Sequence, residues 1–426
     1  MESIFILKGD ICYSKRLGEL QTMEQGYLVC RNGCVEGVYE EIPADFQGVE
    51  VKDCGRSLII PGLVDLHMHA PQYSFRGMHM DLELLEWLER YTFPEEVKYK
   101  DLGYARDMYG KFVDRLTYSA TTRACIFATI HVPATEILME QLEASGLCTM
   151  VGKVNMDRNA PADLTEENAQ VSGEETVEWV LDCRKRFQRT KPILTPRFIP
   201  SCSDEMLENL KKIQMRYGLP VQSHLSENVE EIVWVKELCP EAEFYGDAYD
   251  RFGLFGADCP TIMAHCVHCE EQEIQRMKEN GVFVAHCPES NMNLASGIAP
   301  VRTYLEEGIA VGLGSDIAGG TTENIFSAMM HAIQASKLRQ SLMKENAAPL
   351  TIPEVFYMAT KGGGAFFGRV GSFESGYAFD ALVLDDSRLG EPEKHSISDR
   401  LERFVYLNQE IDVKAKYVEG REIFWR

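Results

Sequence analysis

Eight short apolar segments, separated by stretches of helical character, constrain the fold of this chain more than any other feature. They are residues 58–67, 122–128, 148–156, 192–198, 220–224, 261–265, 282–286 and 310–316. Short, predominantly apolar runs of this length are typical of strands that are buried on both faces of a parallel sheet. Repeated alternation of such strands with helices predicts an α/β fold, and specifically a (β/α)8 TIM-type barrel rather than an open sheet.

The stretches with helical character are residues 82–89, 134–144, 174–189, 204–217, 227–238, 270–280, 301–307 and 323–344. The two ends of the chain have a different pattern, because they contain short strand-like runs. These are residues 3–8, 26–29, 34–39 and 49–52, and then 379–384, 413–418 and 422–425. We therefore expect residues 1–60 and 371–426 to form one small β-sandwich domain, and residues 61–370 to form a catalytic barrel.

Side chains that can bind metal stand at the carboxyl ends of the apolar segments. His67 and His69 end the first segment, and residues two apart in a strand point to the same side. His224 and Asp316 end the fifth and eighth segments. In a barrel these ends meet at one face, where active sites lie. Three imidazoles and one carboxylate suit Zn²⁺ with a position left for water, and Fe²⁺ also suits a set without thiolate. The pattern predicts a mononuclear metal hydrolase, although Asp316 alone would also fit an ordinary turn.

Three further residues end or follow these segments. Glu227 lies three positions after His224, and a helical start there would turn both side chains toward one pocket. We expect Glu227 to act as a general acid or base, the alternative being a helix N-terminal residue favoured by the macrodipole. His265 is placed to hydrogen-bond attacking water, or else to serve as a core histidine. His286 is expected to be structural or to support the ligands.

The composition argues against two classes of partner. A formal net charge of −23 repels both nucleic acid and anionic lipid, so we expect neither to bind. The first residues lack the features of a signal peptide, and the thirteen scattered cysteines suit free thiols in a reducing cytosol. We expect a cytoplasmic protein. Cys266 and Cys269 have CxxC spacing without a second pair, which does not favour structural zinc.

Motifs along most of the chain resemble the amidohydrolase superfamily and, within it, the guanine deaminase family. The matching segments are PGLVDLHMH (61–69), APQYSF (70–75), LLEWL (84–88), YTFP (91–94), FATIH (127–131), GKV (152–154), TPRF (195–198), QSHLSE (222–227), AH (264–265), AHCP (285–288) and GLGSD (312–316). The HxH pair and the final aspartate belong to the whole superfamily. The segments LLEWL, YTFP and TPRF are more specific to guanine deaminases.

This resemblance implies hydrolytic deamination of guanine to xanthine and ammonia, in purine catabolism or salvage. It implies that Gln72, Arg197, Phe198 and His224 contact the purine, and chemistry agrees: a guanidinium donates to a carbonyl, and an aromatic ring packs on a base. Binuclear relatives carry a bridging lysine where this chain has Arg197, so one Zn²⁺ per chain is expected. The family also implies a homodimer.

By the same resemblance, Asp316 takes a proton from the attacking water and Glu227 protonates N3 of guanine. His265 then stabilises the developing charge on oxygen. Segments 71–94 and 318–320 are expected, from their positions, to cover the site.

Three other functions compete with this one. The first is a different mononuclear-metal aminohydrolase of the same barrel, acting on another nucleobase, a pterin or a triazine. The second is a catalytically inactive relative that serves as a scaffold, which the complete set of ligands and proton carriers argues against. The third is a deaminase of nucleic acids, which would carry another zinc signature and a different charge.

Overall fold

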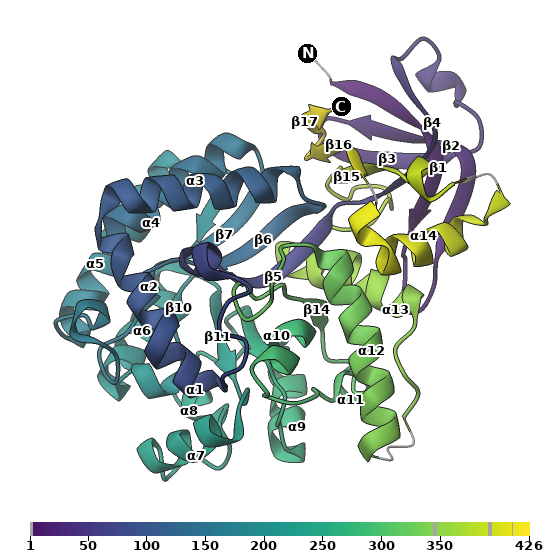
Figure 1. Cartoon of the computed structure of the whole chain (residues 1–426). Helices are drawn as coiled ribbons and strands as arrows, with labels where there is room; N and C mark the ends of the chain where they lie inside the picture. The colour runs from purple at the N-terminus through teal and green to yellow at the C-terminus, as the bar shows by residue number, and fades with distance from the viewer. Residues whose placement is uncertain (1–2, 344–346, 391–393, 411) are drawn as a thin grey trace.

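The computed structural model describes residues 3–343, 347–390, 394–410 and 412–426, and these form a mixed α/β fold with parallel sheets (Figure 1). One parallel sheet contains β5 (Leu63–His69), β6 (Thr121–Phe127), β7 (Cys148–Gly152) and β9 (Thr190–Pro192). The other contains β11 (Val221–Leu225), β12 (Thr261–His265), β13 (Phe283–His286) and β14 (Val311–Leu313). A short parallel pair joins β8 (Val154–Asn155) and β10 (Thr195–Pro196).

Hydrogen bonds connect the two four-stranded sheets at both of their borders. At one border, the backbone N–H of Leu194 donates to Pro220, and that of Gln222 donates to Leu194. At the other, the N–H of Asp316 donates to the carbonyl of His67 over 2.9 Å. Within each sheet, the parallel strands bring their carboxyl ends to a common edge.

The main helices lie around the outside of these sheets (Figure 1). They are α3 (Leu102–Tyr118), α4 (Val132–Ser145), α5 (Ala169–Arg186), α6 (Asp204–Tyr217), α7 (Val229–Leu238), α9 (Glu271–Asn280), α11 (Val301–Glu306) and α12 (Ile325–Met343). Helix α3 was not predicted, although Asp101 caps its first turn by accepting from Gly103 and Tyr104. The predicted end of the last of these helices, at Lys344, lies outside the described residues.

The first apolar segment, 58–67, is wrong as a single strand. Residues up to Pro61 belong to β4 (Val51–Pro61) of a separate sheet, and β5 begins at Leu63. Gly62 makes the transfer possible, because a Cβ there would lie 2.1 Å from Oγ1 of Thr122. Only glycine lets the backbone pass this closely between the two sheets.

Both ends of the chain build that separate sheet, which has seven strands in the order β17-β16-β15-β4-β1-β2-β3. Its other strands are β1 (Ile4–Tyr13), β2 (Gln21–Arg31), β3 (Cys34–Tyr39), β15 (Ala381–Asp385), β16 (Asp412–Val418) and β17 (Arg421–Trp425). A helix in this region, α14 (Ile397–Tyr406), was missed, because the prediction there contained only strands. Its signal was present as a capping box between Ser396 and Asp399.

Buried charges fix this terminal sheet to the rest of the molecule. Nε of Arg123, on β6, lies 2.6 Å from Oδ2 of Asp380, just before β15. Lys416, fully buried on β16, donates to the carbonyl oxygens of Leu116, Thr117 and Thr121. These contacts satisfy buried polar groups that would otherwise destabilise the junction.

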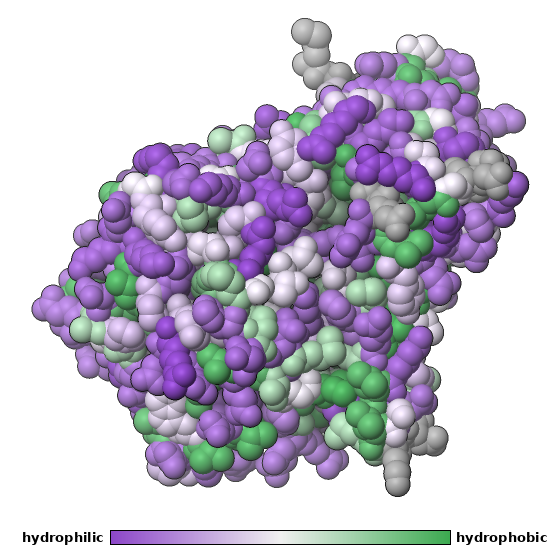
Figure 2. All heavy atoms as spheres, viewed as in Figure 1, coloured by the Kyte–Doolittle hydropathy of each residue, from purple (hydrophilic) through white to green (hydrophobic). Residues whose placement is uncertain are grey.

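The face in Figure 2 is mostly hydrophilic, with apolar atoms gathered over the lower part of α12. No helix in the described part of the chain combines the length and the apolar character that are needed to cross a bilayer.

Candidate active site

The end of β5 and the segment after β14 place the first ligand candidates together. The backbone N–H of Asp316 bonds to the carbonyl of His67, and the N–H of His69 bonds to that of Ile317. Nε2 of His67 then lies 3.2 Å from Oδ1 of Asp316, and Nε2 of His69 lies 3.6 Å from the same oxygen. Asp65 supports this join, because its Oδ1 accepts from the N–H groups of His67 and Ser315.

His224 completes the predicted ligand set from the opposite sheet. It lies on β11, and its Nε2 is 3.2 Å from Nε2 of His69. The potential ligand atoms of His67, His69 and His224 all lie within 4.8 Å of one another. One of these nitrogens can donate to the other, or both can bind one cation when both are unprotonated.

Burial disfavours the charged form of these imidazoles. Burial lowers the pKa of His67, and it lowers those of His69 and His224 well below the usual value. Burial alone would raise the pKa of Asp316, but the adjacent imidazoles, His67 first, hold that pKa well below its ordinary range. Neutral imidazoles and an ionised carboxylate are the forms that bind a metal ion.

Two carboxyl groups whose pKa values are shifted in opposite directions flank His265. Its Nε2 lies 3.3 Å from Oε2 of Glu227 and 3.8 Å from Oδ2 of Asp316. Burial raises the pKa of Glu227 well above its usual value, and the charges of Glu231 and Asp316 add to this effect. One carboxyl group is therefore held protonated beside another that is held ionised, which is the arrangement that acid–base catalysis needs.

The backbone at these positions is unusual. His265 has φ 72°, Asp316 has φ 47° and Ser226 has φ 47°, all in the left-handed region. Non-glycine residues rarely adopt this region, and such conformations cluster at functional sites. His265 is further fixed by Asn291, whose Oδ1 lies 2.9 Å from Nδ1 of the imidazole.

A small pocket opens onto this cluster, and its lining includes every predicted substrate contact. Gln72, Arg197, Phe198 and His224 all line it, beside Glu227, His265 and Asp316. Its apolar wall comes from Leu84, Trp87, Leu88, Phe198 and Leu294. The first three of these belong to α1 (Leu84–Trp87) and the turn after it, within segment 71–94. A flat, largely apolar ligand with a polar edge fits such walls.

Comparison with known proteins identifies the family to which this chain belongs. The family model described as the amidohydrolase family matches residues 58–423 of the chain. This chain belongs to the amidohydrolase family. Amidohydrolases are metal-dependent, and the histidine and aspartate cluster is where this one has a possible metal-binding site.

Several similar proteins are described as guanine deaminases. The guanine deaminase of Dictyostelium discoideum is 36% identical, over 99% of this chain and 98% of its own length. The guanine deaminase of Escherichia coli K12 is 34% identical, over 96% of this chain and 93% of its own. A crystal structure of the guanine deaminase from C. acetobutylicum, with guanine bound in its active site, superposes with a TM-score of 0.96. It is 47% identical and covers 99% of this chain and 100% of that one.

Sequence reasoning missed three residues of the amidohydrolase site. Glu96 lies behind the pocket and bonds to both Gln72 and Arg197. Glu231 accepts from the backbone of Glu227, and a capping-box spacing from Asn228 could have revealed it. Cys287 lies within reach of the cluster, but burial raises the pKa of its thiol well above the usual value, which opposes a thiolate ligand.

His286 and the CxxC pair are not among the predicted catalytic, substrate-binding or metal-binding residues. His286 is buried, and burial lowers its pKa to about 3, in agreement with a neutral structural residue. All thirteen cysteines, including Cys266 and Cys269, are free.

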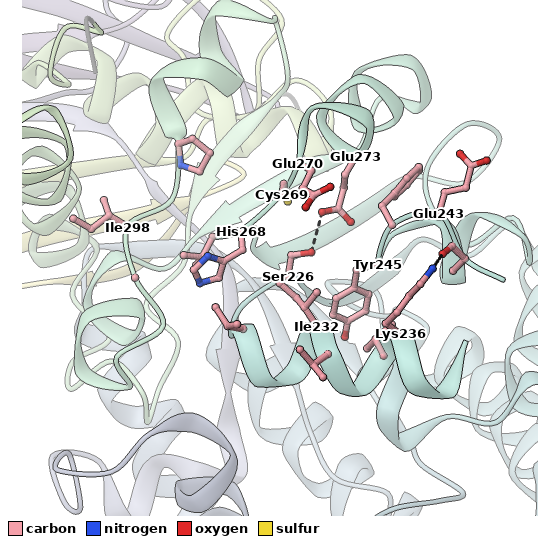
Figure 3. Close-up of a pocket in the computed structure, with 18 of the residues that line it drawn as sticks. Ser226, Ile232, Lys236, Glu243, Tyr245, His268, Cys269, Glu270, Glu273 and Ile298 are labelled. Carbon is pink, nitrogen blue, oxygen red and sulfur yellow. Dashed lines mark hydrogen bonds between the residues drawn. The ribbon is translucent and has the colours of Figure 1, made fainter. Parts of the chain in front are cut away.

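A larger hollow, of about 750 Å³, lies beside α7 (Figure 3). Ser226 donates to Glu273 over 2.9 Å at its wall, and Nε2 of His268 lies 2.6 Å from the carbonyl oxygen of Ser296. Of the described residues that line this hollow, none is a predicted ligand or substrate contact. The reacting groups are therefore gathered in the smaller pocket.

Proposed function

We propose that this amidohydrolase is a guanine deaminase, which hydrolyses guanine to xanthine and ammonia. The observation that carries the proposal is the pocket itself. It places a guanidinium, a carboxamide and an aromatic ring, from Arg197, Gln72 and Phe198, within one chamber with Glu227 and Asp316. The relatives described as guanine deaminases, each aligned over nearly its whole length, support the same assignment.

We propose that His67, His69, His224 and Asp316 hold one metal ion, with Zn²⁺ preferred and Fe²⁺ as the alternative. The close approach of the potential ligand atoms supports this set: those of His67, His69 and His224 lie within 4.8 Å of one another, and Oδ1 of Asp316 lies 3.2 Å from Nε2 of His67. When bound, the metal ion supplies a water of lowered pKa that is nucleophilic near neutral pH.

The chain's own residues would carry the protons. Ionised Asp316 accepts a proton from the attacking water, and protonated Glu227 donates to N3 of guanine as the C2–O bond forms. The imidazole of His265 would stabilise the charge that develops on the oxygen bound to C2. The C2–N bond then breaks, and the amino group leaves as ammonia with the proton from Asp316. As the C2 carbonyl forms, the hydroxyl proton returns to Glu227, which restores both carboxyl groups.

Arg197 and Gln72 would orient the base, and Phe198 would pack on it. The remaining N–H groups of Arg197 are suited to donate to O6 of guanine. Such polar contacts fix the position of C2 near the water and the two carboxyl groups, which lowers the entropic cost of reaction.

We also propose the finer architecture. The hydrogen bonds at both sheet borders support a closed eight-stranded barrel over residues 61–370. The seven-stranded sheet supports a separate unit from residues 1–60 and 371–426, whose β-sandwich form stays a prediction. Free cysteines support the predicted cytoplasmic location. The homodimer stays a prediction from the family resemblance.

The direct test is ammonia release by metal-analysed protein, with guanine beside adenine, cytosine, a pterin and a triazine. Guanine turnover well above the others supports the proposal. Metal-loaded protein that leaves guanine intact but deaminates a pterin or triazine would reassign the substrate within the family.

A further inference from the structure

Glu96 stands behind the two polar side chains that face the substrate. It lies on α2 (Phe93–Val97) and is 1% exposed. Its Oε1 accepts from Nε2 of Gln72 over 2.9 Å, and its Oε2 accepts from Nη1 of Arg197 over 2.6 Å. One carboxylate therefore holds both residues, although it does not itself line the pocket.

The carboxamide of Gln72 is held in one of its two orientations. Its Oε1 accepts from the backbone N–H of Ala318 over 3.0 Å, while its amide nitrogen faces Glu96. Rotating the amide by half a turn would put two donors together at Ala318 and two acceptors together at Glu96. Both contacts would be lost in a buried place, where unpaired polar groups are costly.

The guanidinium of Arg197 is held in the same way. Arg197 and Glu96 are 3% and 2% exposed at their side chains, so their charges neutralise each other away from solvent. The guanidinium carbon also lies 5.2 Å from the ring centre of Phe93, on the same helix as Glu96. These contacts fix the plane in which the remaining N–H groups of Arg197 reach the pocket.

We infer that Glu96 is a positioning residue that gives the site its selectivity for a 6-oxopurine over a 6-aminopurine. This inference rests on the proposed deamination of guanine. Arg197 carries only donors, and its bond to Glu96 fixes where they point. Because Glu96 only accepts, Gln72 cannot rotate its amide to suit another base. An oxygen on C6 accepts from those donors, whereas an amino group on C6 would meet them donor to donor. By holding Arg197 and Gln72 in these orientations, Glu96 decides which purine edge is bound.

The test uses substrates that all keep the reacting 2-amino group: guanine, 2-aminopurine and 2,6-diaminopurine. We expect Glu96→Gln to raise KM for guanine at least about tenfold with a smaller change in kcat, because an uncharged amide cannot accept from both neighbours. We expect the ratio of kcat/KM for guanine to that for 2,6-diaminopurine to fall by about the same factor.

Glu95→Gln is the matched control. Glu95 neighbours Glu96 on α2 and also binds several partners, namely Ser74, Lys98 and Tyr104, but it contacts neither Gln72 nor Arg197. We expect this variant to keep the wild-type KM and selectivity ratio. A folded, metal-loaded Glu96→Gln protein with unchanged KM and ratio would overturn the inference. Absence of guanine turnover in the wild type would instead overturn the proposed function.

The double variant Gln72→Glu/Glu96→Gln covers the case in which the single variant does not fold. It restores donor–acceptor pairing behind the pocket, since the amide at position 96 donates to position 72 and accepts from Arg197. We expect the fold to recover while KM for guanine stays raised, because position 72 no longer donates. Recovery of the wild-type KM and ratio would contradict a role in selectivity.

Discussion

Nδ1 of His224 lies 2.6 Å from the backbone carbonyl oxygen of Arg197. A carbonyl oxygen only accepts, so Nδ1 carries the proton and Nε2 is left for a metal ion. Arg197 thus has two separate parts: its backbone orients a proposed ligand, and its side chain lines the proposed substrate pocket. A change to the side chain should leave the metal site intact.

Arg197→Ala is therefore expected to raise KM for guanine at least about tenfold while the metal content per chain stays unchanged. The reason is that the carbonyl at position 197 remains after the substitution. Steady-state kinetics combined with elemental analysis checks both parts. Arg197→Lys keeps the charge without the planar guanidinium, so its KM for guanine should lie between those of the wild type and Arg197→Ala. Loss of metal from either variant would show that the side chain is needed to build the ligand set.

Glu227→Gln is expected to lower kcat by at least about 100-fold and to retain metal, since it removes the proton donor without removing a proposed ligand. Rate measurements and elemental analysis on the same preparation check this. Near-normal turnover would exclude Glu227 as the proton carrier.

The same variant should change how stability depends on pH. Because burial raises the pKa of Glu227, the folded protein favours the protonated form. That contribution to stability is complete below the unfolded pKa of about 4.3 and is lost as pH rises through the folded value. The thermal midpoint of Glu227→Gln, relative to the wild type, should therefore increase as the pH rises above about 5. A difference that stays constant across this range would contradict the assigned protonation.

Removal of metal should abolish activity and lower the thermal midpoint, because a bound ion stabilises only the folded state. Chelated wild-type protein is expected to recover with Zn²⁺ or Fe²⁺, and His69→Asn is expected not to recover. His286→Asn is the matched control. His286 is also a buried histidine at a strand end, but it is not one of the residues whose potential ligand atoms lie close together. Full metal binding by His69→Asn would contradict the proposed ligands.

The junction between the terminal sheet and the parallel strands can be tested at Arg123. Arg123→Ala leaves Asp380 buried without its partner, which is expected to lower the free energy of unfolding by about 3 kcal/mol. Chemical denaturation measures this, and activity per folded molecule should be unchanged. Arg186→Ala is the surface control. The side chain of Arg186 is 34% exposed, so loss of its ion pairs should lower the free energy of unfolding only slightly. Equal losses in both variants would mean that the junction carries no special stability.

The sequence alone determined the parts that depend on local pattern. Apolar runs that end in histidine or aspartate predict buried parallel strands with ligands at their ends. In the structure, the ligand atoms of His67, His69 and His224 lie within 4.8 Å of one another, and Oδ1 of Asp316 lies 3.2 Å from Nε2 of His67. The periodicity of a strand and the chemistry of imidazole are properties of the residues themselves, so they can be read without a structure.

Only the tertiary structure decided the contacts between distant segments. Glu96 lies 101 positions from Arg197, and no local pattern distinguishes it from Glu95 beside it. The division of the first apolar segment at Gly62 depends on Thr122, from another strand. The raised pKa of Glu227 likewise depends on burial and on charges brought close by folding. Electrostatics and packing act through space, so these features follow from the folded arrangement of the chain.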